Sequence, residues 1–147
     1  MHIETWDRTS LREQEQVVGR DRTEGAPLSG GSEFTEPDLT RAGNDGAPLI
    51  ARTSHVAIAH PSRNDGVRML RRGYNYTDGS DGLGKLDAGL MFLAFVTDPR
   101  THYVPMQTAM ARNDALAEYL RHTGSGLFAV PGGVGPGEYV GQRLFEA

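Results

Sequence analysis

The sequence predicts an α+β domain of the ferredoxin-like class, with an antiparallel sheet and two helices on one of its faces. Two observations indicate this class. The expected elements follow the order βαββαβ, with a long irregular insertion over residues 20–64. The chain has 147 residues, which is enough for one domain of ordinary size and too few for two. We therefore expect a single domain over residues 1–147, with a loosely ordered tail over residues 131–147.

The first two elements are expected to be a strand and a short helix. Residues 1–6 alternate apolar and polar side chains, as a half-buried strand does. Ser10 and Glu13 have the spacing of a capping box, in which each side chain satisfies a free backbone N–H at the start of a helix. The helix is expected to run through Val18 and to end at Gly19.

Residues 20–64 show no sustained periodicity, because glycines and prolines interrupt them repeatedly. A loop of this length inside a domain is either functional or disordered. An ordered excursion is favoured because the segment carries residues that can be buried, namely Leu28, Phe34, Leu39, Leu49, Ile50, Val56 and Ile58.

Regular structure is expected again after the excursion. Residues 67–74 fit a strand, and residues 77–88 form a turn rich in glycine and aspartate. Residues 89–96 are apolar on both faces, as expected of a central, buried strand. A helix is expected over residues 105–122, followed by a last short strand over residues 127–130.

Composition excludes several classes of function. The net charge is −4, so the whole molecule gives a nucleic-acid partner no electrostatic support. No apolar run approaches the ~20 residues of a membrane span. The chain has no cysteine, which excludes disulfides and thiolate ligands and leaves imidazole as the soft nitrogen ligand. The five histidines are His2, His55, His60, His102 and His122.

No signal peptide is recognisable at the start of the chain. The chain as it stands is therefore expected to be cytoplasmic. Met1 also fits an internal methionine of a longer protein. Secretion is expected instead if the preceding part carries an export signal.

Three polar side chains are candidates for chemistry. His55 has apolar neighbours that suit a neutral nitrogen ligand, although spacing alone favours a structural histidine. Strand alternation places Arg71 on the face opposite Arg72, toward the apolar side, where a guanidinium needs an anion or a developing negative charge. An arginine that simply reaches solvent fits the same pattern. Asp114 follows the apolar stripe of the last helix and suits either a partner for a liganding histidine or a solvated surface position.

Leu90 and Phe92 lie in the apolar strand and are most simply core residues. They equally suit an apolar wall over a flat cofactor.

The residues carry a resemblance that runs in order through the whole chain. Its landmarks include Ser54-His55-Val56, Leu70-Arg71-Arg72-Gly73-Tyr74, Gly89-Leu90-Met91-Phe92, Asn113-Asp114-Ala115-Leu116 and Thr123-Gly124-Ser125-Gly126-Leu127-Phe128. The sequence resembles the dye-decolourising (DyP-type) haem peroxidases, and it is most similar to their exported bacterial branch. The resemblance implies the C-terminal one of two ferredoxin-like domains, as in a dimeric α+β barrel.

The resemblance also implies a site. His55 matches the proximal histidine that ligates the iron of haem b, and Arg71 matches the distal arginine. Asp114 matches the carboxylate that hydrogen-bonds the proximal histidine, and Leu90 and Phe92 match apolar residues on the distal side. The implied reaction uses hydrogen peroxide to oxidise dyes, phenols or other small aromatic reductants through a ferryl haem.

The sequence departs from the family in one respect. The family's distal aspartate lies in a Gly-x-x-Asp-Gly motif, and no segment of the 147 residues supplies it. If the protein is a peroxidase, we therefore expect another polypeptide to complete its site. That polypeptide is either an N-terminal half present as a separate chain or a further copy in a homo-oligomer. The alternatives are a non-catalytic haem-binding module and a degenerate ferredoxin-like fragment that binds no cofactor.

Overall fold

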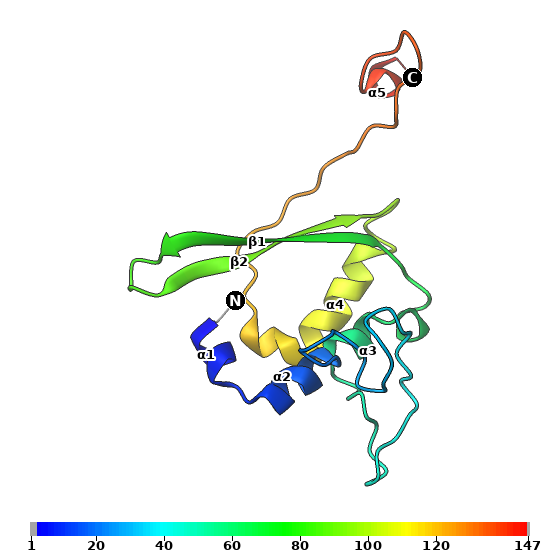
Figure 1. Cartoon of the computed structure of the whole chain (residues 1–147). Coiled ribbons are helices and arrows are strands. Elements are labelled where there is room, and N and C mark those ends of the chain that lie inside the picture. Colours follow the sequence, from blue (N-terminus) through cyan, green and yellow to red (C-terminus); the bar gives the residue numbers. More distant parts are fainter. Residues whose placement is uncertain (1–2, 147) are drawn as a thin grey trace.

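A computed structural model of the chain describes residues 3–146. Figure 1 shows three parts: a layer of short helices, a long β-hairpin above it, and a tail that extends away from both. The helical layer contains α1 (Ile3–Arg8), α2 (Leu11–Val18), α3 (His55–Ala59), the 3-10 helix η1 (Pro61–Arg63), α4 (Tyr103–Asn113) and the 3-10 helix η2 (Ala115–Tyr119). The hairpin consists of β1 (Leu70–Ser80) and β2 (Leu86–Phe95), and the tail ends in α5 (Gln142–Phe145). The α+β class with an antiparallel sheet is as predicted.

The core lies inside the helical layer. Val17 of α2, Ala57 of α3, Met106 of α4 and Tyr119 of η2 are buried, as is Ile50, which the excursion contributes. Burial of such side chains is the main favourable term in folding. The packing therefore fixes α3, the helix that begins with His55, against its neighbours.

The predicted strand over residues 1–6 is wrong for the residues that the structure describes. Ile3–Arg8 form α1, and residues 1–2 lie outside the described range. A six-residue alternation does not separate a strand from a short helix, and tertiary contacts decide here. The ring of Trp6 meets the ring of Tyr119 edge-on, with centroids 4.9 Å apart, and Gln14 Nε2 donates to the Trp6 carbonyl at 2.7 Å.

The predicted helix up to Val18 is confirmed as α2. The Glu13 backbone N–H donates to Ser10 Oγ at 3.2 Å, so the serine caps the helix. The Glu13 carboxylate accepts the Tyr119 hydroxyl proton at 3.1 Å instead of closing the capping box. Gly19 ends the helix in the left-handed conformation, with φ of 89°.

Replacing Gly19 with Ala is expected to destabilise the fold. The positive φ costs about 1–2 kcal/mol for a residue with a Cβ. The added Cβ would also lie 3.0 Å from Ser54 Oγ and 3.2 Å from Val56 Cβ. Gly46→Ala is a matched control, since Gly46 has a φ of 78° and open space around it. Urea unfolding should show a larger loss for Gly19→Ala, and equal losses would contradict the close packing of α2 on α3.

The excursion is ordered, as expected, but its end is helical and not irregular. Isolated β-bridges pair Arg20 with Pro27 and Ala42 with Pro48. Over residues 55–63 the chain forms α3 and η1, a correction to the prediction of an irregular loop through residue 64. The five residues of α3 are too few to show helical periodicity, so the sequence pattern does not distinguish them.

The hairpin is confirmed with different bounds. The first strand begins at Leu70 and not at residue 67, and the predicted turn over residues 77–88 shrinks to residues 81–85. There the Asp81 carboxylate accepts the backbone N–H groups of Leu83 and Lys85 at 2.9 Å each. Such local side-chain acceptors favour a tight turn.

The prediction of a central, buried strand over residues 89–96 is wrong for the described residues. The side chains of β2 are largely exposed; Met91, for example, is 61% exposed. Within residues 3–146, β2 pairs with β1 alone, so it is an edge strand of a two-stranded sheet and not a central one.

The last predicted helix is shorter than residues 105–122. The first part is α4, and the chain then turns at Asp114, whose ψ of 118° is not helical, before η2. Asp114 Oδ1 accepts the Leu116 backbone N–H at 2.8 Å and so caps η2. The predicted strand over residues 127–130 is also wrong, because these residues are exposed and irregular in the tail.

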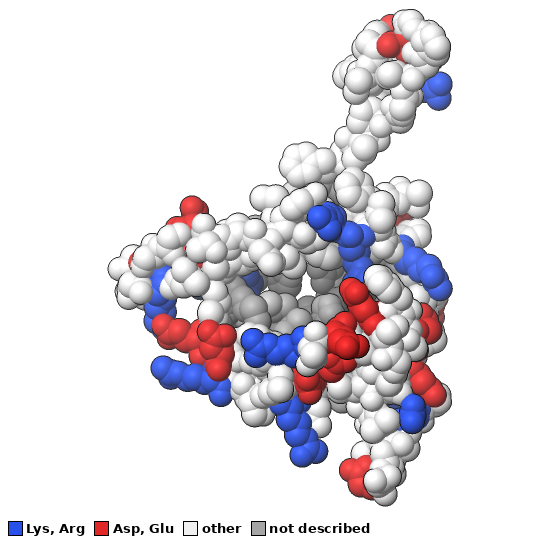
Figure 2. All heavy atoms as spheres, in the orientation of Figure 1, with Lys and Arg blue, Asp and Glu red and all other residues white. Residues whose placement is uncertain are grey.

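Charge and shape differ between the parts of the molecule. In Figure 2, charged side chains gather mainly around the helical layer and the excursion, the stem of the tail is uncharged, and the surface is hollowed below the hairpin. None of the helices in residues 3–146 has the length and apolar character needed to cross a bilayer.

Candidate functional site

The helix start at Ser54 positions His55. Ser54 is fully buried, and its hydroxyl accepts the Ala57 backbone N–H at 3.3 Å, which caps α3. The Ser54 side chain also lies beside Gly19, where a Cβ would meet it at 3.0 Å. His55 is therefore the first residue of a short helix that is anchored on its buried side. The capping role of Ser54 was not predicted from the sequence, although a serine at the start of an apolar run is a signal for a helix cap.

A hydrogen bond joins His55 to Asp114, which is 59 residues later in the chain. His55 Nδ1 and Asp114 Oδ2 are 2.7 Å apart. The Asp114 side chain is 4% exposed, and the Ala115 backbone N–H donates to the Thr53 carbonyl at 2.9 Å, which holds the two segments together. The structure thus brings together two residues that the sequence singled out.

This contact fixes the roles of the two imidazole nitrogens. A carboxylate only accepts hydrogen bonds, so Nδ1 carries the proton and its N–H donates a hydrogen bond to Asp114 Oδ2. Nε2 of the neutral ring then presents a lone pair, and no residue between 3 and 146 donates a hydrogen bond to it. The His55 side chain is 31% exposed. This is the arrangement that proteins use for a liganding histidine, where the acceptor behind the ring orients it and raises its basicity.

Arg71, Leu90 and Phe92 lie on one face of the hairpin. In the antiparallel register Arg71 pairs with Ala94, Gly73 with Phe92 and Asn75 with Leu90, and directly paired residues share a face. Leu90 leans over Gly73, where a Cβ would lie 2.9 Å from Leu90 Cδ1. This surface, defined by Arg71, Gly73, Leu90 and Phe92, is called the Arg71 face below.

The alternation argument for Arg71 is only partly supported. Arg71 and Arg72 do point to opposite faces, but the face of Arg72 is also apolar, with Tyr74, Met91 and Leu93. Both arginines are exposed. They differ in their side-chain contacts: Arg72 lies over the Tyr74 ring, 5.2 Å from its centroid, whereas the guanidinium of Arg71 has no ion pair or hydrogen bond with the described residues. The guanidinium of Arg71 is therefore available to another group.

The other polar groups do not form a second site of this kind. Among residues 3–146, no group of three His, Asp or Glu side chains lies close enough to hold a metal ion. His60 Nε2 and Glu36 Oε1 are 2.8 Å apart, and Ser62 caps the other ring nitrogen at 2.8 Å. His60 thus ties the excursion to the end of α3. Nearby, the Thr40 hydroxyl donates to Asp38 and holds the pKa of that carboxyl below its usual value.

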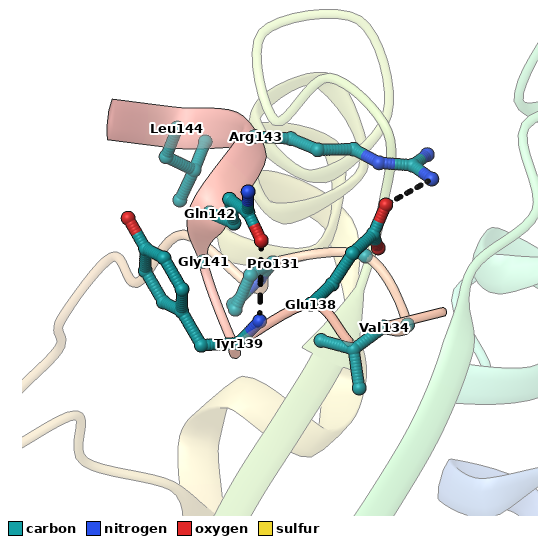
Figure 3. Close-up of a pocket in the computed structure, with 10 residues that line it drawn as sticks. Pro131, Val134, Glu138, Tyr139, Gly141, Gln142, Arg143 and Leu144 are labelled. Carbon is teal, nitrogen blue, oxygen red and sulfur yellow. Dashed lines mark hydrogen bonds and ion pairs between the residues drawn. The ribbon is translucent and has the colours of Figure 1, made fainter. Parts of the chain in front are cut away.

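Neither of two hollows in the described structure contains a predicted site residue. One is a cavity of about 50 Å³ within the tail (Figure 3), where the Glu138–Arg143 ion pair and the Tyr139–Gln142 hydrogen bond close a small loop. The other, of about 380 Å³, is an open hollow beside α2 that is bordered by Trp6, Gln14 and Arg20. The candidate site is instead made of His55 with Asp114 and, separately, the Arg71 face.

Replacing Asp114 with Asn is expected to weaken any metal or cofactor bound at His55. The amide keeps the shape of the carboxylate but removes the negative charge beside Nδ1. Loss of such a partner of a ligating histidine typically lowers metal affinity about 10–100-fold. A haemin titration followed by absorbance would measure the change. Asp98→Asn is a suitable control, since Asp98 bonds to Arg100 in an exposed loop. An unchanged affinity in Asp114→Asn would contradict the role of the contact.

Comparisons with known proteins show which family the chain matches. Residues 1–135 match the family described as "Dyp-type peroxidase, C-terminal". The chain is 42% identical over 147 residues to the dye-decolorizing peroxidase of Thermobifida fusca and 37% identical over 147 residues to the deferrochelatase of Escherichia coli. These alignments cover 99% and 98% of the chain but 34% of each relative. The chain thus spans about a third of the length of these relatives.

Solved structures agree with the sequence comparison. A DyP-type peroxidase from Streptomyces coelicolor superposes with a TM-score of 0.94 at 46% identity, over 100% of this chain and 40% of that one. Ferric DtpA from Streptomyces lividans gives the same values, and a DyP-type peroxidase from Cellulomonas bogoriensis gives 0.93 at 39% identity with the same coverage. The likeness confirms the ferredoxin-like α+β class predicted from the sequence, although only two of its strands form within the described residues.

Proposed function

The chain belongs to the DyP-type peroxidase family, whose C-terminal part it matches, and on this premise we propose that it is the haem-ligating part of a peroxidase that uses hydrogen peroxide to oxidise dyes or phenols. Peroxidases of this family are haem-dependent. The observation that carries the proposal is the 2.7 Å contact between His55 Nδ1 and Asp114 Oδ2, which leaves Nε2 as a lone-pair donor. The cofactor that we propose is haem b.

The residues present fit this cofactor. A haem needs an axial nitrogen with a fixed tautomer, and His55 supplies it. It also needs apolar surface against the flat macrocycle, for which we propose Leu90 and Phe92 on the Arg71 face. Leu90 is 54% and Phe92 41% exposed, so both keep apolar surface available. When bound, haem would supply the iron at which peroxide is cleaved and through which the reductant gives up electrons.

Three residues of the chain have a defined role in this proposal. His55 Nε2 would hold the iron, and Asp114 would orient the ring and increase its electron donation. Arg71 would stabilise the negative charge that develops as the O–O bond of hydrogen peroxide breaks, because a fixed guanidinium in a water-poor site stabilises such charge strongly. The transfer of a proton between the peroxide oxygens is assigned to the aspartate of the Gly-x-x-Asp-Gly motif, which is outside the 147 residues.

A complete site therefore requires a partner. We propose that the polypeptide that precedes the matched part in relatives, present as a separate chain or in cis, supplies this aspartate. A homo-oligomer does not complete the site in this way, because a second copy brings no Gly-x-x-Asp-Gly motif. Hydrogen peroxide and a small aromatic reductant are the proposed substrates.

The function is tested by adding haemin and then hydrogen peroxide and an anthraquinone dye, with the N-terminal portion of the Thermobifida fusca relative supplied by co-expression. A peroxidase shows a Soret band with haemin and bleaches the dye only with peroxide. A haem-binding module shows the Soret band without bleaching. A degenerate fragment shows no specific Soret band. The last two results would contradict the proposed activity.

A further inference from the structure

The carboxylate of Asp114 depends on the 3-10 helix η2 for its orientation. Asp114 Oδ1 accepts the Leu116 backbone N–H at 2.8 Å, while Oδ2 lies 2.7 Å from His55 Nδ1. A 3-10 helix has poor internal hydrogen-bond geometry, and η2 has only five residues. The chain that follows, residues 120–135, has no regular structure. The contacts that hold the two ends of η2 therefore set the direction of the carboxylate.

The two ends of η2 are held by different contacts. At its start, the Ala115 backbone N–H donates to the Thr53 carbonyl at 2.9 Å. At its end, the side chain of Tyr119 is buried, and its ring meets the Trp6 ring edge-on. The Tyr119 hydroxyl donates to Glu13 Oε1 of α2 at 3.1 Å. Tyr119 thus anchors the end of η2 by a ring contact and by a hydrogen bond to a carboxylate.

The Glu13 carboxylate serves Tyr119 and not its own helix. The spacing from Ser10 predicts a capping box, in which the glutamate would bond back to the backbone N–H of the cap residue. The serine half of the box forms, since the Glu13 backbone N–H donates to Ser10 Oγ at 3.2 Å. The carboxylate instead accepts the Tyr119 hydroxyl, and the Thr9 hydroxyl lies 3.5 Å from the same phenolic oxygen. A contact with another element therefore replaces the local one, and a charged acceptor makes it a strong hydrogen bond.

Helix α2 also supports the histidine side of the pair. A Cβ on Gly19, the residue that ends α2, would lie 3.0 Å from Ser54 Oγ. Ser54 caps α3, which begins with His55. One helix thus contacts both the element that carries the imidazole and the element that begins after Asp114. Movement of η2 relative to α2 would change the separation of the imidazole and the carboxylate.

We propose that Glu13 and Tyr119 are positioning residues for the pair formed by His55 and Asp114. Their hydrogen bond ties η2 to α2 and so keeps the Asp114 carboxylate within bonding distance of His55 Nδ1. Both residues act through Asp114. The inference rests on the proposed function for the role of His55, but the geometry of the pair is measured without haem.

The test uses the full 147-residue chain without haemin. Nuclear magnetic resonance detects the Nδ1 proton of His55 when its hydrogen bond slows exchange with water, and it also measures the exchange of single backbone amides. Tyr119→Phe keeps the buried ring and removes the hydroxyl. We expect loss of the Nδ1 proton signal and about fivefold faster exchange of the Leu116 amide. The Ala57 amide, which bonds to Ser54 Oγ, should change less than about twofold.

Tyr139→Phe is the matched control for loss of a tyrosine hydroxyl. The Tyr139 hydroxyl also donates to a glutamate, Glu146 Oε1, at 3.0 Å, but it does so in the tail. The imidazole proton and the Leu116 amide should keep the behaviour of the unaltered chain in this variant.

Two substitutions of Glu13 test the acceptor. Glu13→Leu removes the acceptor and should reproduce the effects of Tyr119→Phe. Glu13→Gln keeps an acceptor oxygen and should retain most of the protection. Glu13 is exposed, and its backbone N–H is capped by Ser10, so both variants are expected to keep α2.

A second readout uses the haem-loaded assembly. The iron–histidine stretching frequency should fall in Tyr119→Phe and in Glu13→Leu, because a less well placed carboxylate increases the electron donation of the ring less. It should not change in Tyr139→Phe. A contact that only stabilised the fold would not shift this frequency.

Four results would overturn the inference: absence of the Nδ1 proton signal in the unaltered chain, an unchanged signal and Leu116 amide in Tyr119→Phe, equal acceleration of the Leu116 and Ala57 amides, or an unmoved stretching frequency. Equal acceleration would indicate a general loss of stability. Haemin tests the proposed function separately. Absence of a Soret band in the unaltered protein, together with the expected losses in Tyr119→Phe, would overturn the haem site and leave the positioning contact in place.

Discussion

His55→Ala is expected to abolish haem binding. Titration of haemin into the variant, with the N-terminal portion of the relative present, should give no Soret band above that of free haemin. Loss of a hydrogen-bond partner of a ligating histidine typically lowers metal affinity about 10–100-fold. Loss of the ligand itself should cost more, so we expect the haem affinity to fall at least about a hundredfold. The structural reason is that His55 Nε2 is the nitrogen that Asp114 leaves with a free lone pair.

His60→Ala is the matched control for this experiment. His60 follows the same helix, but its ring nitrogens contact Glu36 and Ser62. It should keep the haem affinity of the unaltered chain. Imidazole added to His55→Ala should restore part of the Soret band, because the His55 side chain is accessible and the small ligand can replace it. Equal affinities in the two variants would contradict His55 as the ligand.

Arg71→Leu is expected to slow the reaction with hydrogen peroxide by about 10²–10³-fold while haem uptake stays nearly intact. Leucine keeps an apolar side chain on the Arg71 face but removes the positive charge that would stabilise the breaking O–O bond. Stopped-flow absorbance after mixing the haem-loaded assembly with peroxide measures the rate.

Arg72→Leu separates a local charge effect from a general one. Arg72 is the next residue of β1, points to the opposite face and lies over Tyr74, so its loss should change the peroxide rate little. Loss of haem in Arg71→Leu, or an equal slowing in Arg72→Leu, would show that Arg71 does not act on the distal side.

Several elements could be predicted because their signals are local. Ser10 and Gly19 bound α2 by capping and by left-handed backbone, which depend on the residue type itself. The apolar run after the glycine-rich turn likewise predicts the second strand of a hairpin. By contrast, α1 and α3 have six and five residues, and contacts with distant side chains such as Tyr119 decide their conformation.

The exposure of the hairpin could not be predicted from its local sequence, because the burial of a strand depends on what packs against it. Residues 89–96 have the sequence of a buried strand, yet they are exposed in the described structure. The mismatch shows that an apolar run by itself does not establish that a strand is buried. The same reasoning applies to residues 127–130, which have the composition of a strand and no neighbouring strand within residues 3–146.

The site was predictable only in part from local pattern. Spacing alone favoured a structural role for His55 and a solvated one for Asp114. The resemblance to the family paired them, and the structure places their side chains in contact at 2.7 Å. The assignment of Arg71 rests on the same resemblance, because alternation along β1 does not separate the two apolar faces.

The iron–histidine stretching band of the ferrous, haem-loaded assembly tests the central assignment most directly, since resonance Raman spectroscopy detects that bond itself. The account predicts a band in the unaltered protein that disappears in His55→Ala. It also predicts a lower frequency in Asp114→Asn, because the ring then donates less electron density to the metal. A band that persists in His55→Ala, or that is unmoved in Asp114→Asn, would contradict it.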